Sequence, residues 1–289
     1  MPEARVAVIG GSGFYQMEDL VEVEEVRPQT PFGQPSDAIV IGILDGTRVA
    51  FLPRHGRGHR LTPSEVPYRA NIAALKAAGC THVLSLSACG SFKEALSPGT
   101  FVLVDQFVDR TRGRVKSFFG DGIVAHVSLA DPVCNPLGAR VADAAKALGI
   151  PFVSGGTYLA MEGPQFSTRA ESRAYVAAGF DVIGMTNMPE AALAREAELC
   201  YASVAMVTDY DSWRPAEEGA NVADILEVMH GNSANARALV AAVAAAWTPS
   251  AACSQGCDHA LDHAIITDPA LWPPPVVETL RGVAGRVLK

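Results

Sequence analysis

A nearly unbroken apolar run, Leu199 to Thr208, ends abruptly at Asp209-Tyr210-Asp211. Its length and its small and β-branched residues are typical of a buried central strand of an α/β sheet. Such sheets bind ligands beyond the carboxyl ends of their strands. Asp209 and Asp211 can point to one side of an extended segment, and close like charges raise each other's proton affinity. The run predicts either paired carboxylates for acid catalysis and N–H binding, or a surface turn with two solvated acids.

Short apolar runs alternate with helical patterns along the rest of the chain, which predicts an α/β layered domain. We expect the strands at residues 5–9, 38–43, 48–52, 82–86, 181–185 and 199–208, with a hairpin turn at Asp45-Gly46. We expect helices at 64–78 with Ser64 as the cap, 135–148, from Pro189, 221 to about 247, and from Val276. The predicted organisation is one domain over residues 1–247 and a C-terminal extension, 248–289, packed on it.

The composition allows a large apolar core and argues against nucleic acids and membranes as partners. The chain has 289 residues, of which 49% are apolar, and its net charge is −8. This balance argues against a nucleic-acid surface, which would carry a basic stripe. No apolar run approaches the roughly 18 residues of a membrane span, and the N-terminus lacks a signal-peptide layout. We therefore expect a cytoplasmic protein with no nucleic-acid and no membrane partner.

Six cysteines raise the question of a metal site. Cys253 and Cys257 are followed by His259 and His263, but this spacing is too compressed for the common zinc motifs. Cysteines in apolar contexts behave as small buried hydrophobes. A segment with reduced thiols and no metal is therefore the favoured prediction, and a metal site is the alternative.

Groups that can bind an anion follow four of the expected strands. They are Gly10-Gly11-Ser12-Gly13, Pro53-Arg54-His55-Gly56, Ser87-Ala88-Cys89-Gly90 and Met185-Thr186. The first is a possible phosphate-cradling turn but not a dinucleotide motif, because Gln16 stands where the third glycine is needed. Arg54 can form a forked contact with two oxygens beside the His55 imidazole. A tight bend, a surface arginine and a core histidine are the alternatives.

The loop Met161 to Ser167 offers an aromatic ring and a carboxylate. A base could stack on Phe166, and Glu162 could accept hydrogen bonds from sugar hydroxyls. A core phenylalanine in an ordinary turn is the alternative, since most phenylalanines are used in that way.

The combined motifs resemble those of the trimeric purine nucleoside phosphorylase family, and within it the methylthioadenosine phosphorylase branch. The shared segments are Gly10–Gly13, Thr30–Ala38, Arg54–Arg57, Ala88–Ser91, Asp105–Arg110, Glu162–Ser167, Met185-Thr186 with Pro189-Glu190, and Thr208–Trp213. They cover residues 5 to about 245 in the family's order, whereas the tail after Trp247 does not match in detail. The resemblance implies a three-layer α/β/α sandwich with a central mixed sheet, the phosphorylase/hydrolase-like fold.

The resemblance also implies a reaction and its residues. Inorganic phosphate would attack C1′ of 5′-methylthioadenosine and release adenine and 5-methylthioribose 1-phosphate, a purine and methionine salvage reaction without a cofactor. Phosphate would be held by Ser12, Arg54, His55, Ser87, Ala88 and Thr186. The nucleoside would contact Phe166, Ser167, Met185, the catalytic pair Asp209 and Asp211, a methylthio pocket of Val222, Ile225 and Leu226, and His126 from a neighbouring subunit of a homotrimer.

The pair Ser167 and Asp209 indicates a 6-aminopurine, because the amino group donates and needs an acceptor. Relatives that cleave 6-oxopurine nucleosides carry Glu and Asn at these two positions. The chain departs from the family at Ser12, where Thr is common, and at Asn187-Met188, which is similar to relatives that prefer methylthioinosine. Purine nucleoside and methylthioinosine phosphorolysis therefore stay open, as do a nucleosidase, a nicotinamide-dependent dehydrogenase and a non-catalytic nucleoside sensor.

Overall fold

The computed structural model describes residues 4–11, 19–214, 222–248 and 252–288, with side chains from 227 onward in the third range. Its centre is a mixed 11-stranded sheet with the main order β2-β3-β4-β1-β5-β10-β9-β7, while β11 pairs with β5 and β6, and β6 pairs with β8. The strands are β1 Val6–Gly10, β2 Val21–Val26, β3 Ile39–Leu44, β4 Thr47–Pro53, β5 His82–Ser91, β6 Phe101–Val104, β7 Gln106–Asp109, β8 Phe152–Ser154, β9 Thr157–Ala160, β10 Val182–Gly184 and β11 Cys200–Asp209.

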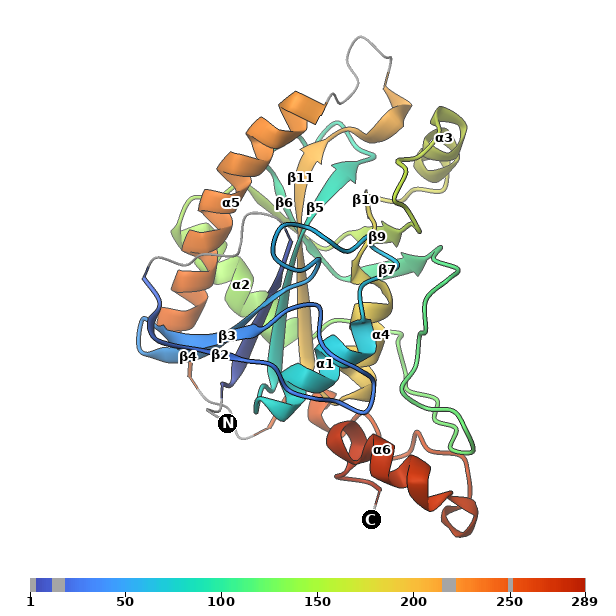
Figure 1. Cartoon of the computed structure of the whole chain (residues 1–289). Coiled ribbons are helices and arrows are strands. Elements are labelled where there is room, and N and C mark those ends of the chain that lie inside the picture. The colour runs from blue at the N-terminus through green and yellow to red at the C-terminus, as the bar shows by residue number, and fades with distance from the viewer. Residues whose placement is uncertain (1–3, 12–18, 215–221, 249–251, 289) are drawn as a thin grey trace.

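Helices cover both faces of this sheet (Figure 1). They are α1 Tyr68–Ala77, α2 Asn135–Ala147, α3 Arg169–Ala177, α4 Asn187–Glu196, α5 Val222–Ala245 and α6 Pro274–Ala284. Helices α1, α4 and α6 contribute to one apolar cluster, and α2 and α5 contribute to another. The sheet lies between these clusters, so the three-layer α/β/α fold and the mixed sheet that the sequence implied are confirmed.

The central strands are parallel and buried on both faces. Strand β1 pairs in parallel with β4 and β5, and β11 pairs in parallel with β5. All five residues of β1 are buried, because helices cover both sides of a parallel sheet and favour continuous apolar strands. The carboxyl ends of β1, β4, β5 and β11 therefore meet at one edge of the sheet.

Most expected elements are present, with shifted boundaries. The hairpin around Asp45-Gly46 forms between β3 and β4, and the apolar run that ends at Asp209 is β11. The helix expected from Ser64 begins only at Tyr68, after Pro67. Ser64 does not cap it, because its hydroxyl donates to the Glu162 carboxylate instead.

The C-terminal tail packs against the same apolar cluster as α1. Leu280 and Val283 of α6 are buried in that cluster together with Ile72 of α1. Arg286 forms an ion pair with Glu198, which lies just before β11. The boundary at residue 247 itself stays a prediction. In the part of the chain that the structure describes, no helix has the length and hydropathy needed to cross a membrane.

Candidate active site

A cavity of about 340 Å³ lies at the carboxyl ends of the central strands. Its size is within the range of small-molecule sites in proteins. Its wall includes Gly11 after β1, Arg54 and His55 after β4, residues 87–90 of β5, residues 184–186 at the end of β10, and Asp209 of β11. The strand ends that the sequence singled out therefore converge on one site.

Two acids form one part of the cavity wall. Asp209 ends β11, and Asp211 begins a short 3₁₀ helix, where only 8% of it is exposed. Burial raises the pKa of the Asp209 carboxyl, and burial together with the charge of Asp209 raises the pKa of Asp211. Oδ2 of Asp211 is buried without a hydrogen-bond partner among the described residues. The pair can hold a proton and can bind N–H groups, so a surface turn with solvated acids is excluded.

The glycine of β5 makes room for these acids. A Cβ at Gly90 would lie 3.0 Å from Oδ1 of Asp209 and 3.2 Å from Cβ of Asp211. Any side chain at this position would displace the two carboxylates or occupy part of the cavity. The close approach of β5 to the acid pair explains the glycine in the Ala88-Cys89-Gly90 segment.

Arg54 is held in place by a buried network that the sequence did not predict. Its Nε and Nη2 donate to the two carboxylate oxygens of Glu190 over 2.8 and 3.0 Å, and Nη1 donates to the Leu86 carbonyl over 3.1 Å. Ser85 and Tyr201 donate to Oε1 of Glu190. The forked contact expected for phosphate is thus made with Glu190. The second N–H of Nη1 is the guanidinium donor that the described contacts leave for an anion in the cavity.

His55 lines the cavity in a defined tautomer. Its Nδ1 lies 2.9 Å from the Leu61 carbonyl oxygen, which can only accept, so Nδ1 carries a proton. Burial and the neighbouring Arg54 charge lower the pKa of His55 to about 4. The neutral ring therefore presents Nε2 as an acceptor, which suits the hydroxyl of a monoprotonated phosphate. The ring also stacks on His59, with centroids 4.3 Å apart.

Two hydroxyls face the same region and share one positioning residue. Ser87 and Thr186 each donate to Oδ1 of Asn187, over 3.1 and 3.2 Å. Asn187 is fully buried and its amide donates to the Ser203 hydroxyl. Ser87, Ala88 and Thr186 line the cavity, as predicted, whereas Asn187 lies behind them.

The loop after β9 supplies an exposed ring but not the expected carboxylate. Phe166 is 67% exposed and lines the cavity with Met185. Ser167 is buried beside Met161 rather than on the cavity wall. Glu162 is outside the cavity, because backbone N–H groups of Arg112 and Gly113 donate to its carboxylate. The expectation that Glu162 contacts a sugar is therefore wrong, since a neighbouring loop already uses its oxygens.

One face of α5 closes the cavity. Met229, Asn232 and Ser233 line it at i, i+3 and i+4. Val222, Ile225 and Leu226 lie seven positions earlier, on the backbone of the same helix, and their side chains lie outside the described part of the chain. The role of these three residues stays a prediction, and sequence reasoning did not name Met229, Asn232 or Ser233. Their spacing, seven residues after the predicted set, keeps them on the same helix face and could have indicated them, although Asn232 and Ser233 are polar.

Two predicted contacts are not tested by this chain alone. Ser12 lies outside the described residues. His126 is exposed on a loop beside the C-terminal tail, where its backbone N–H donates to the Ala264 carbonyl. It does not line the cavity of its own chain. Its role in a neighbouring subunit stays a prediction.

The described side chains that lie close enough together to bind a metal ion are outside this cavity. Among the described residues, the group of His, Cys, Asp and Glu side chains close enough to share one ion consists of four cysteines. None of these four lines the cavity. The chemistry of the cavity therefore depends on its acids, hydroxyls, arginine and histidine.

Comparison with known proteins agrees with this geometry. Residues 5–245 match the family model described as the phosphorylase superfamily. The S-methyl-5'-thioadenosine phosphorylase of Cereibacter sphaeroides is 57% identical, with 98% of both chains covered, and that of Bradyrhizobium diazoefficiens is 54% identical over the full length of both.

Solved structures give the same result. The crystal structure of a methylthioadenosine phosphorylase from an antarctic soil metagenomic library has a TM-score of 0.91 at 44% identity, covering 98% of this chain and 99% of that one. The Schistosoma mansoni methylthioadenosine phosphorylase in complex with adenine has a TM-score of 0.79 at 41% identity, covering 84% of this chain and 91% of that one. The chain therefore belongs to the phosphorylase superfamily.

Proposed function

We propose that this chain catalyses the phosphorolysis of S-methyl-5′-thioadenosine to adenine and 5-methylthioribose 1-phosphate. One observation carries the proposal: a pair of buried acids and a set of anion-binding groups share one cavity. The curated relatives that match the full chain at 54–57% identity have this activity in their names. Inorganic phosphate is the co-substrate, and the reaction needs no cofactor.

The acids and the anion-binding groups act on opposite sides of the bond that breaks. A phosphate oxygen attacks C1′ while the C1′–N9 bond breaks, and the bonding electrons pass to the purine. Asp209 supplies a proton to N7, so adenine leaves as a neutral molecule. The raised pKa of Asp209 favours the protonated form that this step requires. Arg54, the backbone at Ala88 and the Ser87 and Thr186 hydroxyls hold the phosphate, and each hydroxyl then donates its one proton to a phosphate oxygen in place of Asn187.

The base-facing acids favour an aminopurine. The amino group of adenine donates to a carboxylate, whereas the oxo group of hypoxanthine would face acceptor oxygens. A mismatched polar pair in a buried site can lower kcat/KM for the wrong substrate by a factor of about 10⁴. The unusual Asn187 does not alter this choice, because its amide contacts the hydroxyls of Ser87, Thr186 and Ser203 and not the cavity. Phe166 would stack on the base, and Met185 would contact the sugar.

We also propose a homotrimer in which His126 of each subunit completes the site of its neighbour. The support is the family resemblance and the position of His126, which is exposed and outside its own cavity. No cysteine of the described chain is in a disulfide, which is typical of a reducing compartment such as the cytoplasm. In that compartment the reaction would return adenine and 5-methylthioribose 1-phosphate to purine and methionine salvage. Light scattering on the purified protein measures the subunit number.

A spectrophotometric assay of base release, with and without phosphate, tests the activity. Strict dependence on phosphate, with methylthioadenosine used far better than methylthioinosine or inosine, is the expected result. Release of adenine without phosphate would indicate a nucleosidase. Binding of methylthioadenosine without turnover would indicate a sensor, and preferred cleavage of methylthioinosine would contradict the base assignment.

A further inference from the structure

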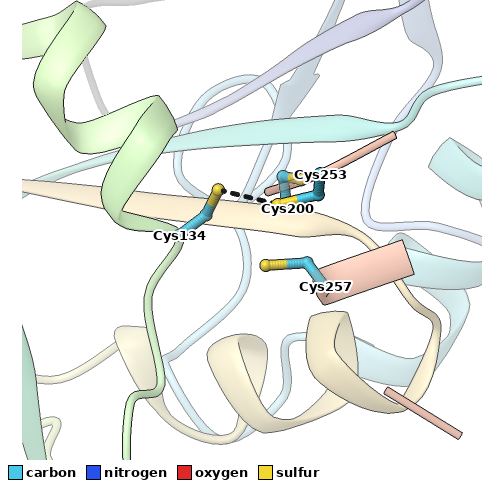
Figure 2. A group of neighbouring side chains, drawn as sticks. All are labelled: Cys134, Cys200, Cys253 and Cys257. Carbon is cyan, nitrogen blue, oxygen red and sulfur yellow. Dashed lines mark hydrogen bonds between the residues drawn. The ribbon is translucent and has the colours of Figure 1, made fainter. Parts of the chain in front are cut away.

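Four cysteine side chains from three separate stretches of the sequence bring their sulfurs close together. Sγ atoms of Cys134, Cys200, Cys253 and Cys257 all lie within 4.8 Å of one another. Figure 2 shows the four side chains converging from different segments. Cys134, Cys200 and Cys257 are buried and Cys253 is half-buried.

Three parts of the fold deliver these side chains. Cys134 is the residue before α2, and Cys200 is the first residue of β11. Cys253 and Cys257 come from the C-terminal tail, where Gly256 adopts a left-handed φ of 73° that turns the chain between them. The side chain of Gln255 accepts from the N–H of Asn135 and donates to the carbonyl of Val133. These contacts hold the tail turn directly beside Cys134.

The sulfur positions are close to the dimensions of a tetrahedral thiolate site, with one distance at the ideal value and the others no longer than 4.8 Å. A Zn–S bond of about 2.3 Å places the sulfurs of a tetrahedron about 3.8 Å apart. Sγ of Cys134 lies 3.8 Å from Sγ of Cys253, and no cysteine of the described chain is in a disulfide. Four sulfur ligands in this arrangement select zinc, or iron, over harder cations.

A nearby cation can offset the charge of such a site. Four thiolates around Zn²⁺ leave two negative charges. Nη1 of Arg195 lies 3.6 Å from Sγ of Cys257, and Nη2 donates to the Asp131 carbonyl, which fixes the guanidinium. Arg195 is 9% exposed, so its charge acts at short range in a poorly solvated region. Hydrogen bonds from outer groups to ligand atoms are typical of metal sites.

We propose that Cys134, Cys200, Cys253 and Cys257 bind one structural Zn²⁺ that fastens the C-terminal tail to the α/β domain. Binding replaces the four thiol protons, which pass to solvent, and zinc keeps its oxidation state. The protein fills all four positions, so no coordination site is left for a substrate. The site is also separate from the catalytic cavity, whose wall contains none of these cysteines.

The sequence-based preference for a segment without a metal considered only neighbours along the chain. His259 and His263 are not part of the cluster, and Nδ1 of His259 lies 3.3 Å from the Asp262 carboxylate instead. The missing pair of ligands comes from Cys134 and Cys200, more than 50 residues before Cys253. The prediction of no metal is replaced by this proposal.

Elemental analysis of the full chain tests it. The protein is purified under reducing conditions without a metal-affinity step, and we expect about one zinc per subunit. Cobalt added to the metal-free protein should give the intense visible absorption of tetrahedral cobalt thiolate. Removal of zinc should lower the Tm by roughly 5 °C or more.

Matched variants separate the metal from simple loss of a thiol. Cys253→Ala changes the half-buried ligand and should lose most of the zinc while the chain still folds. Cys80→Ala changes a buried cysteine outside the cluster and should keep it. The proposal is overturned if the reduced protein has neither zinc nor a cobalt spectrum, if iron is found instead, or if the four cysteines are isolated as disulfides.

Discussion

The backbone N–H of Asp211 donates a hydrogen bond to Oδ1 of Asp209 over 2.9 Å, and the Thr208 hydroxyl donates to Oδ2 over 2.7 Å. Asp209 is thus oriented by its own strand end, while Asp211 stays buried next to it with an unpartnered oxygen. The two acids share a site in which full ionisation of both is unfavourable.

Replacing Asp209 should remove the proton donor without removing the anion site. We expect Asp209→Ala to lower kcat by about 10²–10⁴, the usual contribution of a general acid. Phosphate binding, measured by calorimetry, should persist because Arg54, Ser87 and Thr186 are unchanged. Near-normal turnover would refute the role of Asp209.

The stability of this variant distinguishes lost chemistry from lost folding. Burial raises the folded-state pKa of Asp209, so ionisation above its unfolded pKa costs the folded state free energy. Removing the carboxyl removes that cost at pH 7. We therefore expect the denaturation midpoint of Asp209→Ala to stay equal to or above that of the parent. A large fall in the midpoint would mean that the variant tests folding rather than catalysis.

Glu190 should be essential for stability. It forms a fully buried ion pair with Arg54, and both side chains are 1% exposed. Glu190→Gln leaves the guanidinium charge without a charged partner, and breaking such a pair costs about 3–5 kcal/mol. Chemical denaturation should detect this loss. Glu278→Gln breaks the exposed pair with Arg281 and should cost less than about 1 kcal/mol. Equal losses in the two variants would contradict the buried network.

Asn187 should act on phosphate and not on the nucleoside. It orients the Ser87 and Thr186 hydroxyls without lining the cavity. We expect Asn187→Ala to raise the KM for phosphate about tenfold, or about 1.4 kcal/mol, because the Ser87 and Thr186 side chains lose the partner that holds them beside the cavity. The KM for methylthioadenosine at saturating phosphate should change little. Ser203→Ala, which removes only the contact behind Asn187, should give a smaller change in the same direction. A matching rise in the nucleoside KM would refute this division of roles.

Local patterns predicted the strand ends well, because a buried parallel strand must be continuously apolar and must stop where polar groups begin. Arg54, Ser87, Thr186 and Asp209 converge for that reason. The hydrogen-bond partners of each side chain were harder to predict. The direction of Glu162 depends on N–H groups fifty positions earlier, and the partner of Arg54 comes from a helix late in the chain.

The cysteine cluster shows the same limit. The spacing of Cys253 and Cys257 argued against a metal, because nothing local reveals that β11 and the start of α2 lie beside the tail. The approach of these segments depends on tertiary packing, such as the burial of Cys257 in the cluster formed by α2 and α5. Sequence spacing describes one loop at a time, whereas this site is built from three.

His55 should make stability depend on pH below neutrality. Its folded pKa is about 4, below the ordinary value of 6.5, because burial and Arg54 disfavour the charged ring. The unfolded chain therefore binds more protons between these values, and stability falls as the pH drops from 6.5 toward 4. Between pH 7 and pH 5 this group alone should cost about 2 kcal/mol. Urea denaturation at both pH values measures the difference.

A pair of variants isolates the contribution of that ring. His55→Gln should reduce the loss of stability between pH 7 and pH 5, because glutamine does not titrate. His82 has a folded pKa of about 4 as well, from burial and the Arg140 charge, and it lies outside the cavity. His82→Gln should therefore reduce the pH dependence similarly but leave phosphate binding intact, whereas His55→Gln should weaken it. An unchanged pH dependence in His55→Gln would show that folding does not lower the pKa of the ring, and burial beside Arg54 would then not be what keeps it neutral.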